Sequence, residues 1–227
     1  MEEIDPNIDL VTGEECIEGL DEPDVRARCG HFVYPVHTAV LRPGSRFLQL
    51  ALRDDNGVYH LNLDNEDSDL VRWLFIYLYQ DATTRGLQQR LDDPESFFDT
   101  CHEILHIAAA YSLWRVQHLL LVPLRDLFTE QSSILLNYAN AVNGQLPADE
   151  NEILEDNFGV EFVQLASRIY SHTRFRPLRP AIVSFIVASN CVALEFNVFL
   201  NVVRERPVLF RDILVAIVER LNSIINP

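Results

Sequence analysis

The hydrophobic pattern of this chain changes its period, from two residues near the N-terminus to about 3.6 residues further on. Residues 24–29 alternate between apolar and polar, residues 32–34 continue in extended form after a Gly-His pair, and residues 58–63 alternate again. Alternation of this kind is typical of strands that bury one face. We therefore expect a hairpin over 24–34 and a third strand over 58–63.

Helical spacing of apolar residues begins between these strands and continues after them. The expected helices cover residues 37–41, 45–52, 70–79, 97–111 and 116–128. A Pro-Gly turn over 42–44 separates the first two, and Pro123 indicates a kink or a split in the last. Residues 81–94 are polar and predict a loop.

From residue 131 onward the whole chain has helical character, with turns indicated at 144–147, 176–177 and 206–207. Two apolar stripes in this part predict helix faces that pack on a core, not a cofactor site. The first stripe is Phe162, Leu165, Ala166, Ile169 and Tyr170, and the second is Leu209, Ile213, Ala216, Ile217, Arg220 and Ile224.

These patterns predict an α+β fold in three parts. Residues 1–23 form an acidic flexible leader, residues 24–130 form a domain with a small sheet and clustered helices, and residues 131–227 form an all-helical C-terminal extension. The apolar content of 48% is sufficient for a sizeable core.

Charge excludes one large class of partners. The chain has a formal net charge of −16, and its basic residues are all arginines, spread along the sequence without forming one stripe. Such a chain repels phosphate backbones, so we expect no nucleic-acid binding. The complete absence of lysine has two explanations, a codon or genome bias and a function described below.

The sequence contains no targeting or membrane signal. Residues 1–24 include acidic but no basic side chains, and the longest apolar runs are far shorter than the roughly 20 residues that span a bilayer. Cys16, Cys29, Cys101 and Cys191 are widely separated, which predicts neither a disulfide framework nor a cysteine zinc site. We expect a soluble intracellular protein, cytoplasmic or nuclear, without membrane association.

One motif points to an enzyme. His102-Glu103-Ile104-Leu105-His106 matches the pattern in which two histidines on one helix face hold zinc and the glutamate acts as general base. The extended form of that motif requires glycine at Ala109 and histidine at Ser112, so it fails, and Glu130 is the remaining candidate for a third ligand. A zinc metallohydrolase therefore stays a minor alternative, and we expect no catalytic, metal or cofactor residue.

Residues 24–130 contain a further pattern, spread over scattered single positions. Two strands and a helix entry of the form H..vL...S..F are followed by a third strand, an acidic turn, a helix that ends in YlY and then a helix pair. The positions of this pattern are Asp24, His37, Leu41, Ser45, Phe47, Leu63, Tyr77, Tyr79, Ala108 and Tyr111. At these positions the chain resembles the BTB/POZ family, although in the helix pair alanine stands where the family often has lysine. The helical remainder is similar in layout to the C-terminal extensions of fungal single-BTB-domain proteins.

The resemblance implies a protein-binding module that self-associates or docks a partner, in which these positions are structural. For many members it also implies a substrate adaptor of a cullin-type ubiquitin ligase. Here the lack of lysine would have a function, because an adaptor without lysines offers few sites for its own ubiquitination. The expected partners are thus proteins: a second copy of the chain, a cullin, or another protein.

Overall fold

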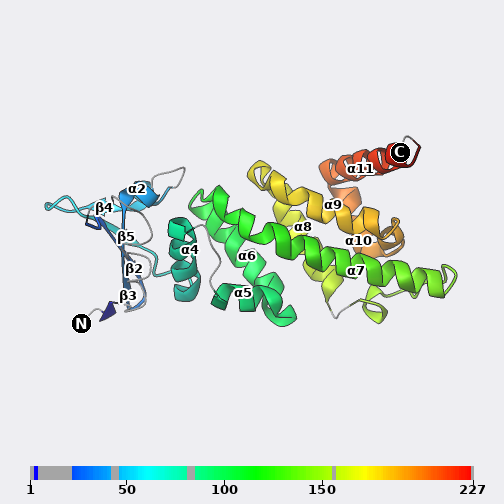
Figure 1. Ribbon diagram of the computed structural model, residues 1–227, viewed down its shortest axis with the longest axis horizontal. Helices are drawn as coiled ribbons and strands as arrows, with labels where there is room; N and C mark the ends of the chain where they lie inside the picture. The colour runs from blue at the N-terminus through cyan, green and yellow to red at the C-terminus, as the bar shows by residue number, and fades with distance from the viewer. Residues whose placement is uncertain (1–2, 5–21, 42–45, 81–84, 155–156, 226–227) are drawn as a thin grey trace. The chain divides into compact units, whose positions relative to one another are not determined.

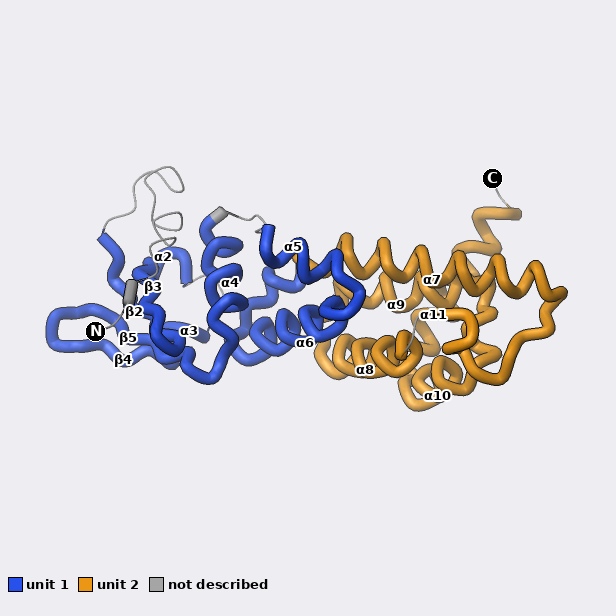
Figure 2. The backbone as a smooth tube through the Cα atoms, turned by 90° about the horizontal axis from the view of Figure 1, so that it is seen from below, with its two compact units in different colours: residues 1–118 blue, residues 119–227 orange. Residues whose placement is uncertain are grey.

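The computed structural model describes residues 3–4, 22–41, 46–80, 85–154 and 157–225 (Figure 1). The chain consists of two compact units, residues 1–118 (unit 1) and 119–227 (unit 2) (Figure 2). Unit 1 combines a sheet with helices and unit 2 is helical in its described residues, so the predicted mixed α+β class is confirmed. The boundary expected at 130/131 falls within helix α7 (Leu121–Ala141). Most of the expected leader lies outside the described residues.

The sheet of unit 1 has the strand order β1-β3-β2-β5-β4. Its strands are Glu3–Ile4 (β1), Val25–Cys29 (β2), Phe32–Val36 (β3), Leu52–Arg53 (β4) and Tyr59–Asn62 (β5). The predicted hairpin is formed by β2 and β3, which turn at Gly30 with a φ of 58° that suits glycine. The predicted third strand, β5, pairs in parallel with β2. The two-residue strands β1 and β4 lie at the edges and were not expected.

The helices of unit 1 begin close to where the apolar spacing predicts them, with two corrections. They are Thr38–Leu41 (α2), Phe47–Leu50 (α3), Ser68–Gln80 (α4), Arg85–Asp92 (α5), Pro94–Ala110 (α6) and Trp114–Leu120, a 3-10 helix at the unit boundary (η2). The loop expected over 81–94 is wrong for α5, and the helix expected over 45–52 ends at Leu50, before β4. Helix α6 starts at Pro94 because the Asp93 carboxylate accepts a hydrogen bond from the Glu95 amide.

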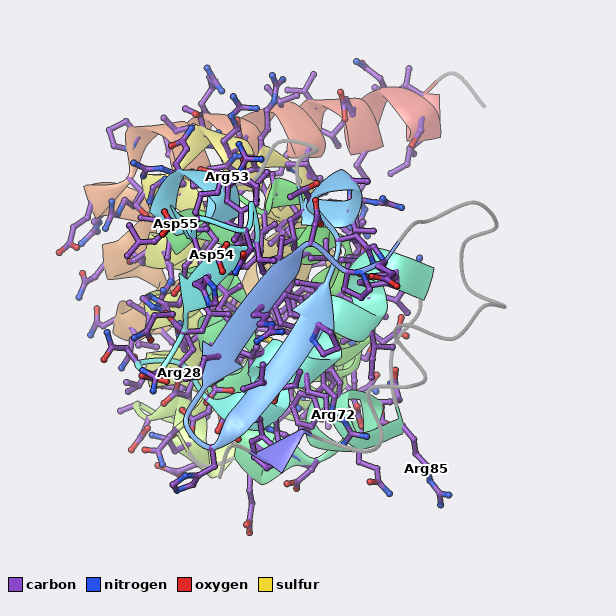
Figure 3. All side chains as sticks on the ribbon, turned by 90° about the vertical axis from the view of Figure 1, so that its left-hand side faces the viewer. Arg28, Arg53, Asp54, Asp55, Arg72 and Arg85 are labelled. Atoms are coloured by element: carbon purple, nitrogen blue, oxygen red, sulfur yellow. The ribbon has the colours of Figure 1, made fainter. Side chains whose placement is uncertain are left out.

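The core of unit 1 lies between one face of the sheet and the helices. Along β2 the buried Val25, Ala27 and Cys29 alternate with exposed arginines, so only one face is covered. Aromatic rings continue this core, with Tyr34 5.5 Å from Phe75 between ring centroids. No described helix covers the other face of the sheet (Figure 3).

Unit 2 is a group of helices around a cluster of phenylalanines. Besides α7, its helical segments are Glu150–Glu152 (η3), Phe158–Ser171 (α8), Thr173–Leu178 (η4), Arg179–Ala188 (α9), Val192–Glu195 (η5), Asn197–Glu205 (α10) and Pro207–Ile225 (α11). Pro123 lies in the first turn of α7, where a missing N–H is tolerated, and the expected split falls just before it, between η2 and α7.

Five phenylalanines from four helices form the centre of unit 2. They are Phe128 of α7, Phe158 and Phe162 of α8, Phe185 of α9 and Phe199 of α10. Their ring centroids approach to 4.8 Å, between Phe162 and Phe185, and several pairs meet edge to face. Such pairs stabilise a core beyond the burial of their area. The helical stripe predicted in α8 is part of this cluster, since Phe162, Leu165, Ala166 and Ile169 are buried.

Helix α11 differs from the prediction. Of the apolar stripe expected to pack on the core, Leu209 and Ile213 are buried, whereas Ile224 is 68% exposed. No helix within the described ranges has the length and apolar character needed to cross a bilayer.

Candidate protein-binding surfaces

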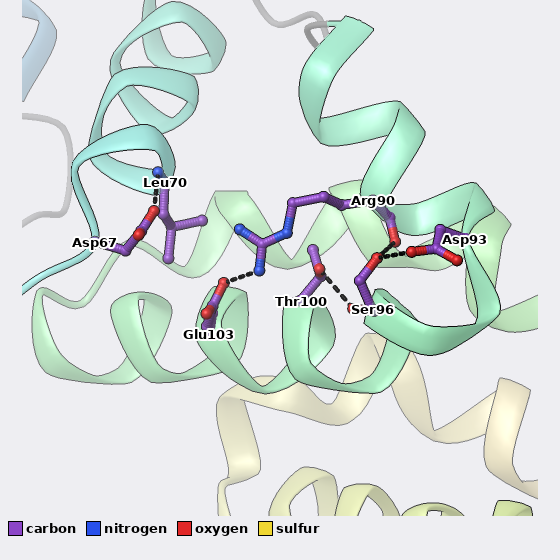
Figure 4. A network of polar contacts seen from close by, with 7 residues as sticks. All are labelled: Asp67, Leu70, Arg90, Asp93, Ser96, Thr100 and Glu103. Atoms are coloured by element: carbon purple, nitrogen blue, oxygen red, sulfur yellow. Dashed lines mark hydrogen bonds and ion pairs between the residues drawn. The ribbon is translucent and has the colours of Figure 1, made fainter.

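Two residues of the His102–His106 motif on α6, Glu103 and His106, have polar partners in unit 1. The Glu103 carboxylate accepts a hydrogen bond from Nη2 of Arg90 at 2.6 Å, so it serves as the partner of an arginine (Figure 4). Nε2 of His106 lies 3.7 Å from a carboxylate oxygen of Glu66. Among the described residues, no three His, Cys, Asp or Glu side chains are placed to hold a metal ion together.

Arg90 joins α5 to α6 at several points. Its carbonyl oxygen accepts a hydrogen bond from the hydroxyl of Ser96 at 2.9 Å, and the same hydroxyl lies 2.9 Å from the Asp93 carboxylate (Figure 4). Its guanidinium also stands 5.3 Å from the ring centre of Trp73 on α4. The ion pair of Glu103 with Arg90 is therefore one of several contacts that hold α5 against α6.

The positions that carry the BTB/POZ resemblance lie mainly in the core of unit 1. The Tyr79 hydroxyl contacts His37, and the carboxylate of Asp24 accepts hydrogen bonds from the amide and the hydroxyl of Thr38 at 2.7 Å each. Ser45 lies outside the described residues. The buried members of the set are His37, Leu41, Phe47, Leu63, Tyr77, Tyr79 and Ala108. These positions make interior contacts and do not gather into a surface site.

Two tyrosines of this set, Tyr77 and Tyr111, donate hydrogen bonds from their hydroxyls to distant segments of unit 1. Tyr77 donates to the carbonyl of Arg115 at 3.1 Å, and Tyr111 donates to the Glu66 carboxylate at 2.6 Å while its ring stacks on Phe47. Burial first, and then the hydrogen bond to Glu66, raises the pKa of Tyr111 well above its usual range. Tyr111 therefore stays neutral and acts as a donor.

The open face of the sheet is a first exposed surface. Arg26, Arg28, His60 and Asn62 project from β2 and β5. Together with Val33, Leu52 and Leu61 they line a hollow of about 350 Å³. Two of its polar side chains have partners within unit 1, because Arg28 pairs with Asp64 and Nε2 of His60 lies 3.1 Å from the Asp54 carboxylate. Arg28 and Asp54 are labelled in Figure 3. This face is polar, with a single highly exposed apolar residue, Leu52, among those that line the hollow.

Helix α11 presents a second surface, and its chemistry is different. Six apolar residues fall within about 100° of the helix circumference, next to the buried side formed by Leu209 and Ile213. They are Phe210, Leu214, Ile217, Val218, Leu221 and Ile225, which we call the α11 stripe. Apart from the half-buried Ile217, the exposed fractions of these residues range from 46% to 71%.

The charged residues of α11 all lie outside this arc, and two of them fix the helix to the rest of unit 2. The Asp212 carboxylate accepts a hydrogen bond from the hydroxyl of Tyr170 on α8 at 3.2 Å, and the guanidinium of Arg220 donates to the carbonyl of Val187 at 2.6 Å. The Arg179 guanidinium stacks 4.6 Å from the Tyr170 ring centre. The side of α11 that faces unit 2 is therefore set by polar bonds as well as by packing.

A groove runs beside this polar side of the helix, with a volume of about 550 Å³. It is lined from α11 by Arg211, Asp212, Val215, Ala216 and Glu219 and from η4 and α9 by Arg176, Arg179, Pro180 and Val183. Arginine and carboxylate side chains both line it, so it favours no one sign of charge.

Comparison with known proteins adds no relative: no protein-family model matches the chain, and no curated protein does.

The α11 stripe is the surface that the sequence did not predict. The helix contains two neighbouring apolar rows, one with Leu209 and Ile213 and the other with Leu214, Leu221 and Ile225. The predicted stripe follows the first row and continues to Ile224, near the end of the helix. The signal that would have found the second is the width of the apolar surface, which exceeds what packing on one core needs.

Proposed function

We propose that this chain is a protein-binding module that acts by burying the α11 stripe against a protein, without chemistry of its own. The observation that carries the proposal is that stripe: an apolar helix surface, without charged side chains, that unit 2 leaves uncovered. From the exposed fractions it presents on the order of 600 Å² of surface, the upper end of the largest apolar patch on a typical monomer. Patches of this size are often functional, and larger ones mark interaction sites.

The architecture of unit 1 supports a BTB/POZ-like domain as part of the same proposal. A hairpin, two short helices, a strand parallel to the first and then longer helices follow in the order that the resemblance implies. The bond of Tyr79 with His37 joins two positions of that resemblance, and the bond of Asp24 with Thr38 ties a third to the start of α2. In this proposal unit 1 is an interaction domain and unit 2 supplies a further binding helix.

Affinity purification with matched variants tests the function. Leu221→Arg places a charge in the middle of the stripe, and Ser223→Arg places the same charge on another side of the helix, outside the stripe. Both positions are exposed, so both variants should fold as the wild type does, which circular dichroism checks.

Tagged forms of the three proteins are purified from native extract, and the co-purifying chains, including untagged copies of the protein itself, are quantified by mass spectrometry. We expect the wild type and Ser223→Arg to recover the same chain in near-stoichiometric amount and Leu221→Arg to recover at least tenfold less. Equal recovery by all three, or no such chain with the wild type, would show that the stripe does not bind proteins.

A further inference from the structure

We propose that the α11 stripe binds a second copy of this chain, with the two α11 helices antiparallel around a twofold axis that passes between Ile217 and Val218. This inference rests on the proposed function and names the partner. It follows from the spacing of the stripe, from the placement of charges on α11 and from the area that the stripe offers.

The stripe is symmetric in sequence. Its residues lie at equal distances on either side of the point between Ile217 and Val218, so an antiparallel copy brings each large side chain opposite another one. The facing pairs are Phe210 with Ile225, Leu214 with Leu221, and Ile217 with Val218. A self-complementary surface of this kind is what a twofold dimer requires, whereas an unrelated partner imposes no such symmetry.

The charges of α11 are compatible with this register. In the antiparallel pair Arg211 stands opposite Ile224, Glu219 opposite Ala216, and Arg220 opposite Val215, and Asp212 is opposite Ser223, so no like charges face each other. Two arginines and two acidic residues also leave α11 neutral, although the whole chain carries −16. Two acidic copies can therefore associate through α11 without bringing net negative charge into the interface.

The exposed area reaches the lower end of the range for a dimer. Specific interfaces bury roughly 600–1,000 Å² on each partner, with an apolar centre and a polar rim. The stripe supplies on the order of 600 Å². Ile224, which lies next to it and is 68% exposed, and the stem of Arg211 extend that surface at its border.

The first test is the mass of the full-length chain in solution, measured by size-exclusion chromatography with light scattering at concentrations from about 1 to 100 µM, a range that covers micromolar dimers. We expect twice the chain mass at the upper end for the wild type and for Ser223→Arg, and the single chain mass for Leu221→Arg. A wild type that stays monomeric throughout, or a dimer that survives Leu221→Arg, overturns the inference.

A charge exchange tests the register itself. Leu214→Asp and Leu221→Arg should each be monomeric, because each places an unpaired charge against leucine in both halves of the dimer. When the two variants are mixed, the carboxylate introduced at position 214 of one copy faces the guanidinium introduced at position 221 of the other. We expect at least a tenfold gain in dimer over either variant alone. A mixture no more dimeric than its components overturns the antiparallel register.

Salt gives an independent measurement. An apolar interface between two acidic copies should strengthen as ions screen their repulsion, so we expect the dimer dissociation constant to fall between about 0.05 and 0.5 M sodium chloride, over which the Debye length shortens from roughly 14 to 4 Å. A dissociation constant that rises with salt would indicate a charge-based interface and contradict the inference.

These outcomes separate the inference from the proposed function. A monomeric wild type whose stripe still captures a different chain, with loss in Leu221→Arg, overturns the inference and leaves the function standing. A monomeric wild type that captures nothing overturns both.

Discussion

The hydroxyl oxygen of Tyr79 lies 2.6 Å from Nδ1 of His37 and accepts a hydrogen bond from the main-chain amide of the same residue at 2.9 Å. The contact joins the end of α4 to the segment between β3 and α2, which are far apart in sequence. Both groups are buried, and burial raises the pKa of Tyr79 to about 12. A neutral phenol thus satisfies the polar atoms that His37 brings into the core.

Tyr79→Phe should lower the free energy of unfolding by about 1–3 kcal/mol, because it leaves a buried amide without its acceptor. Urea denaturation followed by circular dichroism measures the change. Tyr138→Phe, on the partly exposed part of α7, is the matched control and should change stability by less than about 0.5 kcal/mol. Equal losses in the two variants would contradict a specific role for the Tyr79 hydroxyl.

Asp24→Asn should cost about 0.5–2 kcal/mol at pH 7, since the carboxylate binds both the amide and the hydroxyl of Thr38 at the start of α2. Burial acts to raise the pKa of Asp24, but the two bonds from Thr38 outweigh it and hold that pKa below its usual value of 3.8. The stabilisation is therefore present above pH 3.8 and is lost as the pH falls through the lowered pKa. Urea midpoints at pH 7 and pH 2 test this, and a loss of the same size at both would count against it.

Alkaline pH should destabilise unit 1 before its buried tyrosines ionise. Burial, followed by the carboxylates of Asp64, Asp67 and Glu66, raises the pKa of the Cys29 thiol from 9.0 to about 11. A thiol with a higher pKa in the folded state contributes stability that is complete below pH 9 and is lost as the pH rises through about 11. We expect the unfolding free energy to decline over this window in the wild type and to decline less in Cys29→Ala. Parallel pH curves for the two proteins would refute the assignment.

Glu103→Gln should lower stability by about 1 kcal/mol or less, as expected for a partly exposed ion pair with Arg90. The purified wild type should contain no stoichiometric zinc by plasma mass spectrometry, since Glu103 is already bound to an arginine. One zinc per chain that disappears in His106→Ala would instead establish the metallohydrolase alternative.

The sequence predicts those elements that carry a long, regular apolar pattern. The alternation over 24–29 and 58–63 indicates β2 and β5, and the apolar spacing over 70–79 indicates α4, although α4 is buried on more sides than that spacing predicts. Helix α5 was missed because it buries only Leu87 and Leu91 in an otherwise polar segment, and β4 because two residues contain no period. The conformation of such short elements is determined by tertiary contacts with neighbouring elements, which a local pattern does not contain.

The candidate surface could not be predicted for a different reason. Both apolar rows of α11 have the same spacing, and the choice of the row that faces the core depends on contacts from α8 and α9, such as the bond of Tyr170 with Asp212. Periodicity states that a helix has an apolar side and does not state what covers it. The bond of Tyr79 with His37 is equally hidden, because it joins two segments by tertiary contact.

The division of the chain at residue 118 also separates its optical probes. Trp73 and Trp114 are the two tryptophans of the chain and both belong to unit 1, whereas the centre of unit 2 consists of phenylalanines. Tryptophan emission therefore reports the opening of unit 1 alone, while most of the helical ellipticity of residues 119–227 is lost only when unit 2 unfolds. Recording both signals during one denaturation shows whether the two units melt as one cooperative body or as two.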